Sequence, residues 1–583
     1  MDVSICIVIA AIESWAGARF GLLFGVQALC SPAIDCNSHA TKKFFWLLLA
    51  VQYLSLKPNT HNHVQDNHPF LGQLPNSLRA ESPVSLYTQW VREHPGAPLI
   101  RHLSFANAEV VVAASLAAQR EILQTQCYAF RKSRLWTRLT RDISGDGIST
   151  LEGFAAHRAH RRVLAAPFAP ANVRGRLGPV FREKAAEFCA LLDGLLDGAG
   201  HEKGEGEGGR RGRTKTAVIR DCADLFSRAT LDIVGIATLG VDMAYLGQAQ
   251  RQVQTKSQSQ SQSKSRPSLF AGVGTGEKGE YTFHEAYREI FTPDALGKLL
   301  LFLNAFLPTR WVPIPANRRF RAATTWLRRV LTERVRARRR EMAAAVADGS
   351  YDGSASRDLL SFLLEESVLT GAAAAAPGRI GGQAGEDQLR AESAQLAARI
   401  LEPTCADIDA LPYMNVFLKE ILRLYPPANA VHREAARDLT IEGVHIPKGT
   451  TFVIPLQCVG LNPAIWGEDA DTFRPSRWVE ERGEGKDPDD LAITMSDTKT
   501  SSTTQHSAAI ASLSSFAFAA FSNGPRICPG KGFATYEIKA ILFEVVQRYR
   551  FLAIEGNFSL ENPSLNLHPR GMNIRFERLE VDT

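Results

Sequence analysis

Phe521-Ser-Asn-Gly-Pro-Arg-Ile-Cys-Pro-Gly530 is the stretch of this 583-residue sequence that decides the fold. It is a loop rich in glycine and proline that presents one cysteine, Cys528, and an apolar helical pattern over Phe533–Val546 follows it directly. Arg526 lies two residues before the cysteine. Both this cation and the N-terminus of the following helix favour the thiolate, which is the form of cysteine that binds metals.

The arrangement of cysteines narrows the choice of metal. Nine cysteines are scattered singly along the chain, which argues for a reducing compartment and against a secreted disulfide scaffold. Zinc takes four ligands, so a lone Cys528 does not suit it, whereas haem iron needs only one axial thiolate because the macrocycle supplies four ligands. A structural cysteine in a tight turn is the ordinary alternative. The pattern Phe-x-x-Gly-x-Arg-x-Cys-x-Gly, however, arises by chance in only about one of several thousand such chains.

The segment resembles the haem-binding loop of the cytochrome P450 family of haem-thiolate monooxygenases at every fixed position. Ala534 and Glu537 are similar to the start of the helix that follows this loop in the family. The resemblance implies that Cys528 is the axial ligand of haem b (iron protoporphyrin IX), that Phe521 shields its sulfur, and that Arg526 pairs with a haem propionate. No catalytic residue is assigned beyond this ligand.

A second motif lies upstream, where Asp407–Leu424 has the pattern of an amphipathic helix. Glu420 and Arg423 are three residues apart and therefore share a helix face. Followed by Tyr-Pro-Pro, the helix resembles the Glu-x-x-Arg helix of the family, and Arg477 is similar to the third partner of that pair. The resemblance implies a buried charge network that stabilises the core on the haem side, in which the loss of one member would strand a buried charge.

Two further segments resemble the family's propionate contacts. Arg433 follows the proline pair, in a stretch that is similar to the border of the substrate pocket. His157 and Arg161 lie in Glu152–Phe168, which resembles the family's helix with a Trp-x-x-x-Arg or His-x-x-x-Arg motif. Without the resemblance, this stretch would be interpreted as a solvated basic helix.

Composition and periodicity set the fold class. The chain is 45% hydrophobic and 22% charged, as folded globular proteins are, and a net charge of +6 is too weak to indicate a nucleic-acid partner. Helical patterns dominate, with short strand-like runs such as Leu439–Ile454, where Glu442–Gly443 forms a turn. These features predict a mainly α (α+β) fold. The resemblance implies the family's triangular, α-rich domain with small β-sheets.

The chain is expected to form one large haem domain, residues 69–583, after a hydrophobic leader at residues 1–68. No leader run reaches the roughly 20 apolar residues of a spanning helix, but Val3–Leu29 as one element could anchor the chain in a membrane, with Lys42 and Lys43 on the cytosolic side. The alternative is a poorly structured or signal-like leader. Four stretches of low apolar content are predicted to be flexible insertions: 198–214, 251–280, 371–388 and 481–511.

One motif of the family is not found in this sequence. Members carry a central helix over the haem with an (Ala/Gly)-Gly-x-(Asp/Glu)-Thr motif, whose acid–alcohol pair delivers protons to bound oxygen. The residues between Ser367 and Leu411 are few and rich in alanine and glycine, and Ala384–Gln388 has glutamine in place of the threonine. Gln388–Ile400 fits better as the end of the preceding helix. We therefore predict that the central helix is absent, through a gene model that skips a coding segment or as a real property of the protein.

The resemblance implies a monooxygenase that inserts one oxygen atom from O2 into a small, lipophilic organic substrate. It implies electrons from NADPH through a flavin reductase that docks on the basic face near the thiolate. It also implies membrane association, at the endoplasmic reticulum with the haem domain in the cytosol. The missing motif leaves two alternatives open, a haem-binding remnant that does not activate oxygen and an enzyme that rearranges peroxides.

Overall fold

The computed structural model describes residues 71–105, 108–198, 216–250, 281–291, 312–347, 385–399, 403–478, 515–562 and 567–579, with some single residues between 64 and 360. The predicted leader lies outside the described residues except for Val64 and His68. The insertions 251–280 and 481–511 lie wholly outside them, and 198–214 and 371–388 are described only at Gly198 and from Gly385 onward. Residues 368–384 and 400–402, in the stretch where the family's central helix would end, also lie outside the described residues, so the predicted absence of that helix stays a prediction.

Four small sheets are present in the described part of the chain. The largest has the order β1 (Leu99–Leu103), β2 (Glu109–Ala113), β8 (Thr451–Pro455), β5 (Ala430–Ala435), β3 (Phe130–Lys132). The smaller sheets are β4 (Thr216–Ile219) with β12 (Asn573–Arg578) and β9 (Tyr549–Glu555), β6 (Leu439–Ile441) with β7 (Val444–Ile446), and β10 (Ser559–Leu560) with β11 (Pro569–Arg570). Within the largest sheet β2 and β8 pair in parallel, and the other neighbours are antiparallel.

Helices supply most of the described regular structure, which confirms the predicted mainly α fold. The described α-helices up to residue 347 are α4 (Leu74–Arg79), α5 (Ser85–Glu93), α6 (Leu116–Arg120), α7 (Arg134–Ser144), α8 (Phe154–Ala165), α9 (Pro170–Asn172), α10 (Gly178–Gly198), α11 (Cys222–Leu239), α13 (Phe283–Phe291) and α15 (Pro315–Ala347). The described α-helices from residue 385 onward are α17 (Gly385–Arg399), α18 (Cys405–Asp409), α19 (Pro412–Leu424), α20 (Leu456–Gly460), α21 (Pro463–Trp466) and α23 (Lys531–Arg548). Short π- and 3₁₀-helical turns are η2 (Glu121–Thr125), η3 (Val173–Leu177), η5 (Pro475–Trp478), η6 (Ser515–Ala517) and η7 (Gly524–Arg526).

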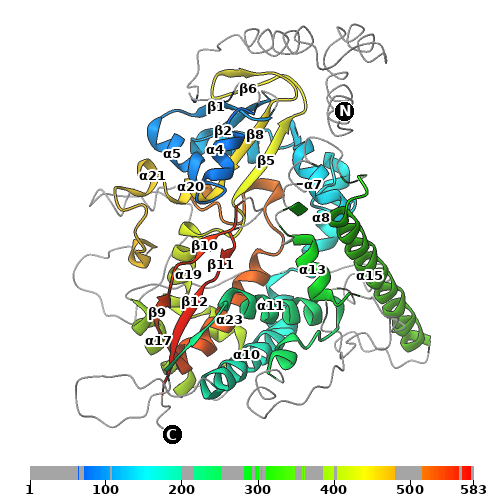
Figure 1. Cartoon of the computed structure of the whole chain (residues 1–583), viewed down its shortest axis with the longest axis vertical. Coiled ribbons are helices and arrows are strands. Elements are labelled where there is room, and N and C mark those ends of the chain that lie inside the picture. The colour runs from blue at the N-terminus through cyan, green and yellow to red at the C-terminus, as the bar shows by residue number, and fades with distance from the viewer. Residues whose placement is uncertain are drawn as a thin grey trace.

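The largest sheet and the helices α10, α11 and α23 lie toward opposite ends of the molecule. In Figure 1 the largest sheet lies near the top, α10, α11 and α23 lie toward the bottom, and α15 runs along the right-hand edge. The largest hydrophobic cluster joins α10, α11 and α23, with Phe181 and Phe533 in edge-to-face contact at a centroid distance of 5.0 Å. A second cluster joins the sheet to η2 and η6. The loop that carries Cys528 lies directly before α23, which contributes Phe533 to the first cluster.

Two local predictions can be compared with the structure. The turn at Glu442–Gly443 is confirmed, since it joins β6 to β7 with positive φ angles of 47° and 76°. The single helix predicted over Asp407–Leu424 is wrong, because the chain forms α18 and then starts α19 at Pro412. Proline has no N–H to donate and favours the first position of a helix, so it begins a new helix there rather than continuing the old one.

No helix within the described residues is long and apolar enough to cross a membrane.

Candidate active site

The loop that carries Cys528 is closed by backbone hydrogen bonds and presses against η2. The Cys528 amide donates to the carbonyl of Phe521 at 2.9 Å, and the Ile527 amide donates to that of Gly524 at 3.0 Å. Gly524 has a φ of +72°, and a Cβ at this position would lie 2.0 Å from the carbonyl oxygen of Leu123. Glycine is therefore required here both for the backbone angle and for the close approach. These hydrogen bonds and the contact with η2 hold Cys528 in place before the start of α23.

Cys528 is exposed, whereas the other described cysteines, Cys127, Cys189, Cys222, Cys405 and Cys458, are buried. Burial raises the pKa of Cys189 and of Cys458 to about 12, which keeps both as neutral thiols. Among the described cysteines, Cys528 alone thus has a sulfur accessible to a ligand from outside the protein. No cluster of three or more His, Cys, Asp or Glu side chains that could hold a metal ion is found within the described residues.

The loop is tied to α8, as the structure brings two of the predicted site residues to its edge. Arg161 donates from Nη1 to the carbonyl of Ile527 at 2.5 Å. His157 is buried on the same helix, with Nδ1 3.4 Å from the hydroxyl of Tyr128. Burial, with smaller contributions from Arg526 and other nearby cations, lowers the pKa of His157 to about 4, so that this imidazole is neutral at physiological pH.

Arg526 and Arg433 are buried cations whose charges are poorly compensated. The Arg526 side chain is only 5% exposed, and its Nε and Nη1 have no hydrogen-bond partner in the described part of the chain. Its guanidinium lies 5.4 Å from the ring centroid of Tyr128. Burial, with a smaller contribution from Arg526, lowers the pKa of Arg433 to about 10. The unpartnered donors of Arg526, beside the buried charge of Arg433, form a site that fits an anion, such as the carboxylates of haem.

Two residues at this site were not singled out from the sequence. Lys132 ends β3 and is buried, and its ammonium group donates to the carbonyls of Ile148 and Leu151. Burial lowers the pKa of Lys132 to about 8. Glu152 accepts a hydrogen bond from the Lys132 amide at 2.6 Å and lies 3.5 Å from Nη2 of Arg526. Neither residue belongs to a recognisable motif, so no local signal could have assigned them to the site.

The charge network is present with all three expected members in contact and buried. Glu420 accepts from Nε and Nη2 of Arg423 at 2.9 and 2.7 Å, and from Nε of Arg477 at 2.8 Å. The Arg474 amide and the Trp478 indole donate to the same carboxylate at 2.9 and 2.8 Å. Burial raises the pKa of Glu420, but hydrogen bonds from Arg423 and from the Arg474 amide outweigh that effect and hold its pKa below the usual range. The network joins α19 to η5.

Phe521 lies apart from the cations. Its side chain is half-buried and packs against the cluster of Leu418, Leu422 and Ala520 on the side of α19. The sequence-predicted residues thus form two groups. His157, Arg161, Arg433 and Arg526 are gathered by the Cys528 loop, and Glu420, Arg423 and Arg477 form the network.

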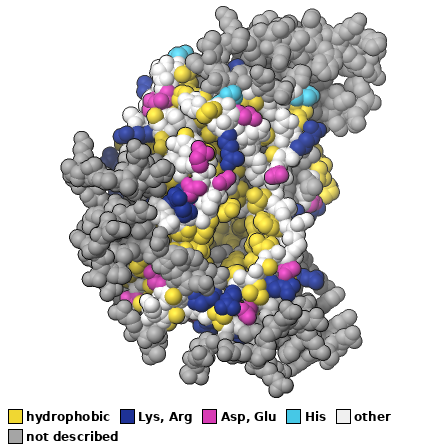
Figure 2. All heavy atoms as spheres, turned by 90° about the vertical axis from the view of Figure 1, so that its left-hand side faces the viewer, with side chains coloured by type: hydrophobic (Ala, Val, Ile, Leu, Met, Phe, Trp, Pro, Cys, Tyr) yellow, Lys and Arg dark blue, Asp and Glu magenta, His cyan; other side chains and the backbone are white. Residues whose placement is uncertain are grey.

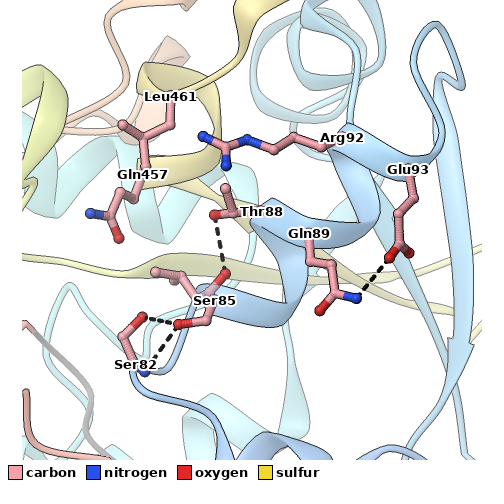
Figure 3. Close-up of a pocket in the computed structure, with 9 residues that line it drawn as sticks. Ser82, Ser85, Thr88, Gln89, Arg92, Glu93, Gln457 and Leu461 are labelled. Carbon is pink, nitrogen blue, oxygen red and sulfur yellow. Dashed lines mark hydrogen bonds between the residues drawn. The ribbon is translucent and has the colours of Figure 1, made fainter. Parts of the chain in front are cut away.

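Two hollows of the surface differ in character. A cavity of about 510 Å³ between α5 and α20 is lined mainly by polar side chains, among them Ser82, Gln89, Glu93 and Gln457 (Figure 3). None of the predicted site residues lines it, and Gln89 already donates to Glu93 at 2.7 Å. The face turned to the viewer in Figure 2 has another hollow, and its walls are largely hydrophobic.

The chain is similar to known proteins over most of its length. A sequence model of the family described as Cytochrome P450 matches residues 63–374 and 384–576. Cytochrome P450 monooxygenase sphH of Aspergillus fumigatus is 27% identical over 91% of this chain and 89% of its own length. Cytochrome P450 monooxygenase FUM15 of Gibberella moniliformis is 26% identical over 85% of this chain and 84% of its own.

The fold is also similar to a solved structure. The crystal structure of the cytochrome P450DA heme domain superposes with a TM-score of 0.58 at 17% sequence identity, over 89% of this chain and 98% of that one.

Proposed function

The chain belongs to the cytochrome P450 family of monooxygenases, and from this premise we propose that it holds haem b through Cys528 and inserts one oxygen atom of O2 into a small, lipophilic substrate. The observation that carries this proposal is the accessible sulfur of Cys528 on a closed loop, beside the buried Arg526, whose Nε and Nη1 lack a partner among the described residues. Haem supplies the oxygen chemistry when it is bound, and the thiolate donates electron density that favours O–O cleavage.

The protein's own residues bind and orient the cofactor in this proposal. Arg526 and Arg433 offer buried donors to the haem carboxylates, and the neutral His157 can add a hydrogen bond without adding charge. Arg161 braces the loop through the carbonyl of Ile527. Once haem covers the open side of the exposed Cys528, Phe521 would shield the sulfur on the side of α19. No described residue beyond Cys528 is assigned a catalytic role.

The network of Glu420, Arg423 and Arg477 has a structural task in this proposal. It fixes α19 against η5 and so stabilises the core that supports the cysteine loop. Each member is buried and hydrogen-bonded to another, so the network acts as one unit.

We also propose that electrons come from NADPH through a flavin reductase. The outer face of α8 carries the exposed Arg158 and Arg162, and it suits an acidic docking partner beside the Cys528 loop. Residues 1–68 would anchor the haem domain, residues 69–583, in the membrane of the endoplasmic reticulum. The hydrophobic hollow of Figure 2 is compatible with a lipophilic substrate.

One sequence feature favours a second candidate. Gln388 stands where the motif of the central helix has threonine, so the proton-delivering pair is not found. A haem-thiolate protein without this pair can still rearrange peroxides, which need iron and thiolate but no proton relay, or it can bind haem without turnover.

A carbon-monoxide difference spectrum of the reduced protein tests the ligand. We expect the long-wavelength band of haem-thiolate proteins in the natural chain and its loss in Cys528→Ala, whereas Cys458→Ala, at a buried cysteine, keeps the band. Survival of the band in Cys528→Ala would refute the assignment. Substrate-dependent NADPH consumption with a reductase then identifies a monooxygenase, and conversion of a lipid hydroperoxide without NADPH identifies the second candidate.

A further inference from the structure

Glu152 is the acid that contacts Arg526 within the described part of the chain. It precedes α8 and lies beside the end of β3, at the rim of the cationic site. Its side chain is 37% exposed, whereas that of Arg526 is 5% exposed. A partly solvated carboxylate therefore lies beside a buried guanidinium cation.

The contact between the two residues is incomplete. One carboxylate oxygen of Glu152 is fixed by the Lys132 amide at 2.6 Å, and the other lies 3.5 Å from Nη2 of Arg526. This is an ion-pair distance, but it is too long for a strong charge-assisted hydrogen bond. Nε and Nη1 of Arg526 remain without a partner. Arg526 can therefore accept a second, better placed anion.

The charges around Arg526 determine how strongly a second anion would bind there. Arg433 is buried, and its hydrogen bond goes to the neutral carbonyl of His432 at 3.0 Å. Arg161 also donates to a neutral carbonyl, that of Ile527. Among the described residues, the site thus holds several buried positive charges and one carboxylate, that of Glu152. A cofactor with two carboxylates would compensate the arginines, and it would place like charges near Glu152.

We infer that Glu152 is a placeholder counter-ion, which neutralises Arg526 in the haem-free protein and competes with the haem carboxylates for it in the loaded protein. The inference rests on the proposed function, since it requires that haem binds at Cys528. It makes Glu152 a positioning residue with two opposite effects: it stabilises the empty protein and weakens the hold on haem.

The variant Glu152→Gln separates these effects, because an amide oxygen can still accept from the Lys132 amide while the charge is gone. The rate of haem transfer from the full-length holoprotein to an excess of apomyoglobin, a haem scavenger, measures the hold on haem. We expect transfer to slow about twofold to fivefold, the range for a partly exposed charge, and the haem-free variant to melt at a lower temperature than the natural protein. Added salt should shrink both differences.

Two controls make the result specific. Glu109→Gln removes an acid of similar exposure, 42%, from an ion pair with the buried Arg101, and it should leave haem transfer unchanged. With the dimethyl ester of haem, which has no carboxylate charges, the natural protein and Glu152→Gln should release the cofactor at the same rate.

The outcomes distinguish the two proposals. If the natural protein lacks the carbon-monoxide band of a haem-thiolate, the proposed function fails. If the band is present and Glu152→Gln releases haem at an equal or faster rate, the placeholder role is refuted. It is refuted equally if the variant differs from the natural protein by the same factor with the dimethyl ester, because a structural effect would then explain the change.

Discussion

Replacing Glu420 by glutamine removes one negative charge from the centre of a buried network and leaves the size of the side chain nearly unchanged. The carboxylate accepts from five donors, which are Nε and Nη2 of Arg423, Nε of Arg477, the Arg474 amide and the Trp478 indole. Glutamine offers one acceptor oxygen, and its NH₂ group would face donors. The variant therefore leaves some N–H donors of the two buried guanidinium groups without an acceptor.

The expected cost follows from that geometry. Breaking a buried ion pair by removing one partner costs about 3–5 kcal/mol, because an uncompensated charge stays in the core. The entropy of unfolding is roughly 2.1 cal/mol/K per residue, so for a chain of this length we expect the melting temperature to fall by about 2–4 °C. The melting temperature is measured at fixed haem concentration, because a bound ligand shifts it.

A matched control uses the same substitution at an exposed pair of the same spacing. Glu341 pairs with Arg338 and also with Arg334 on α15, each at 3.1 Å, and its side chain is 48% exposed. Glu341→Gln should cost less than about 0.5 kcal/mol, as exposed helix pairs do. If Glu420→Gln is no more destabilising than Glu341→Gln, the reasoning about the buried network is wrong.

A triple variant tests whether charge is the cause. Changing Glu420, Arg423 and Arg477 together to apolar residues of similar volume removes the stranded charges as well as the pair. We expect this protein to be more stable than Glu420→Gln. A further decrease would mean that the polar contacts, rather than the charge balance, hold α19 and η5 together.

Two other predictions concern the cysteine loop and α8. The pKa of His157 is lowered by burial from 6.5 to about 4, so the unfolded chain binds a proton that the folded chain does not. The folded protein therefore loses stability relative to the unfolded chain as the pH falls from 6.5 to 4. Over this range the melting temperature of the haem-free protein should fall more steeply than that of His157→Gln. Parallel curves for the two proteins would contradict the burial of a neutral His157. Gly524→Ala should cause loss of haem and severe destabilisation, since its Cβ would meet the carbonyl of Leu123, whereas Gly556→Ala, at a φ of +73° with open space around it, should show only the backbone cost of about 1–2 kcal/mol. Equal melting temperatures for the two alanine variants would show that the close approach at Gly524 is unimportant.

The sequence contained the local part of the site and little of the rest. Glu420 and Arg423 are one helical turn apart, so their contact could be derived from spacing alone. Cys528 and Arg526 are two residues apart on a loop whose glycines limit its shape. The contact of Arg477 with Glu420 came only from the family resemblance, because it joins two segments with no common periodicity.

The positions of Lys132 and Glu152 could not have been derived in this way. Both are ordinary surface residues by type. Lys132 lies at the site only because β3 pairs with β5, opposite Arg433, and Glu152 reaches Arg526 because it folds back onto the Lys132 amide. The break at Pro412 is a different kind of error. The apolar spacing continues through Asp407–Leu424, but the proline cannot continue the hydrogen bonds of the preceding helix.

The parallel pairing of β2 with β8 has a consequence for how the chain folds during synthesis. Residues 110–112 pair with residues 451–453, so the centre of the largest sheet waits for a partner made several hundred residues later. At roughly 5–20 residues per second, that wait lasts tens of seconds. During this time β1 and β2 form a hairpin with an open apolar edge, which is a site for aggregation. The nascent chain of this protein should therefore depend on chaperones that cover its N-terminal strands until β8 leaves the ribosome.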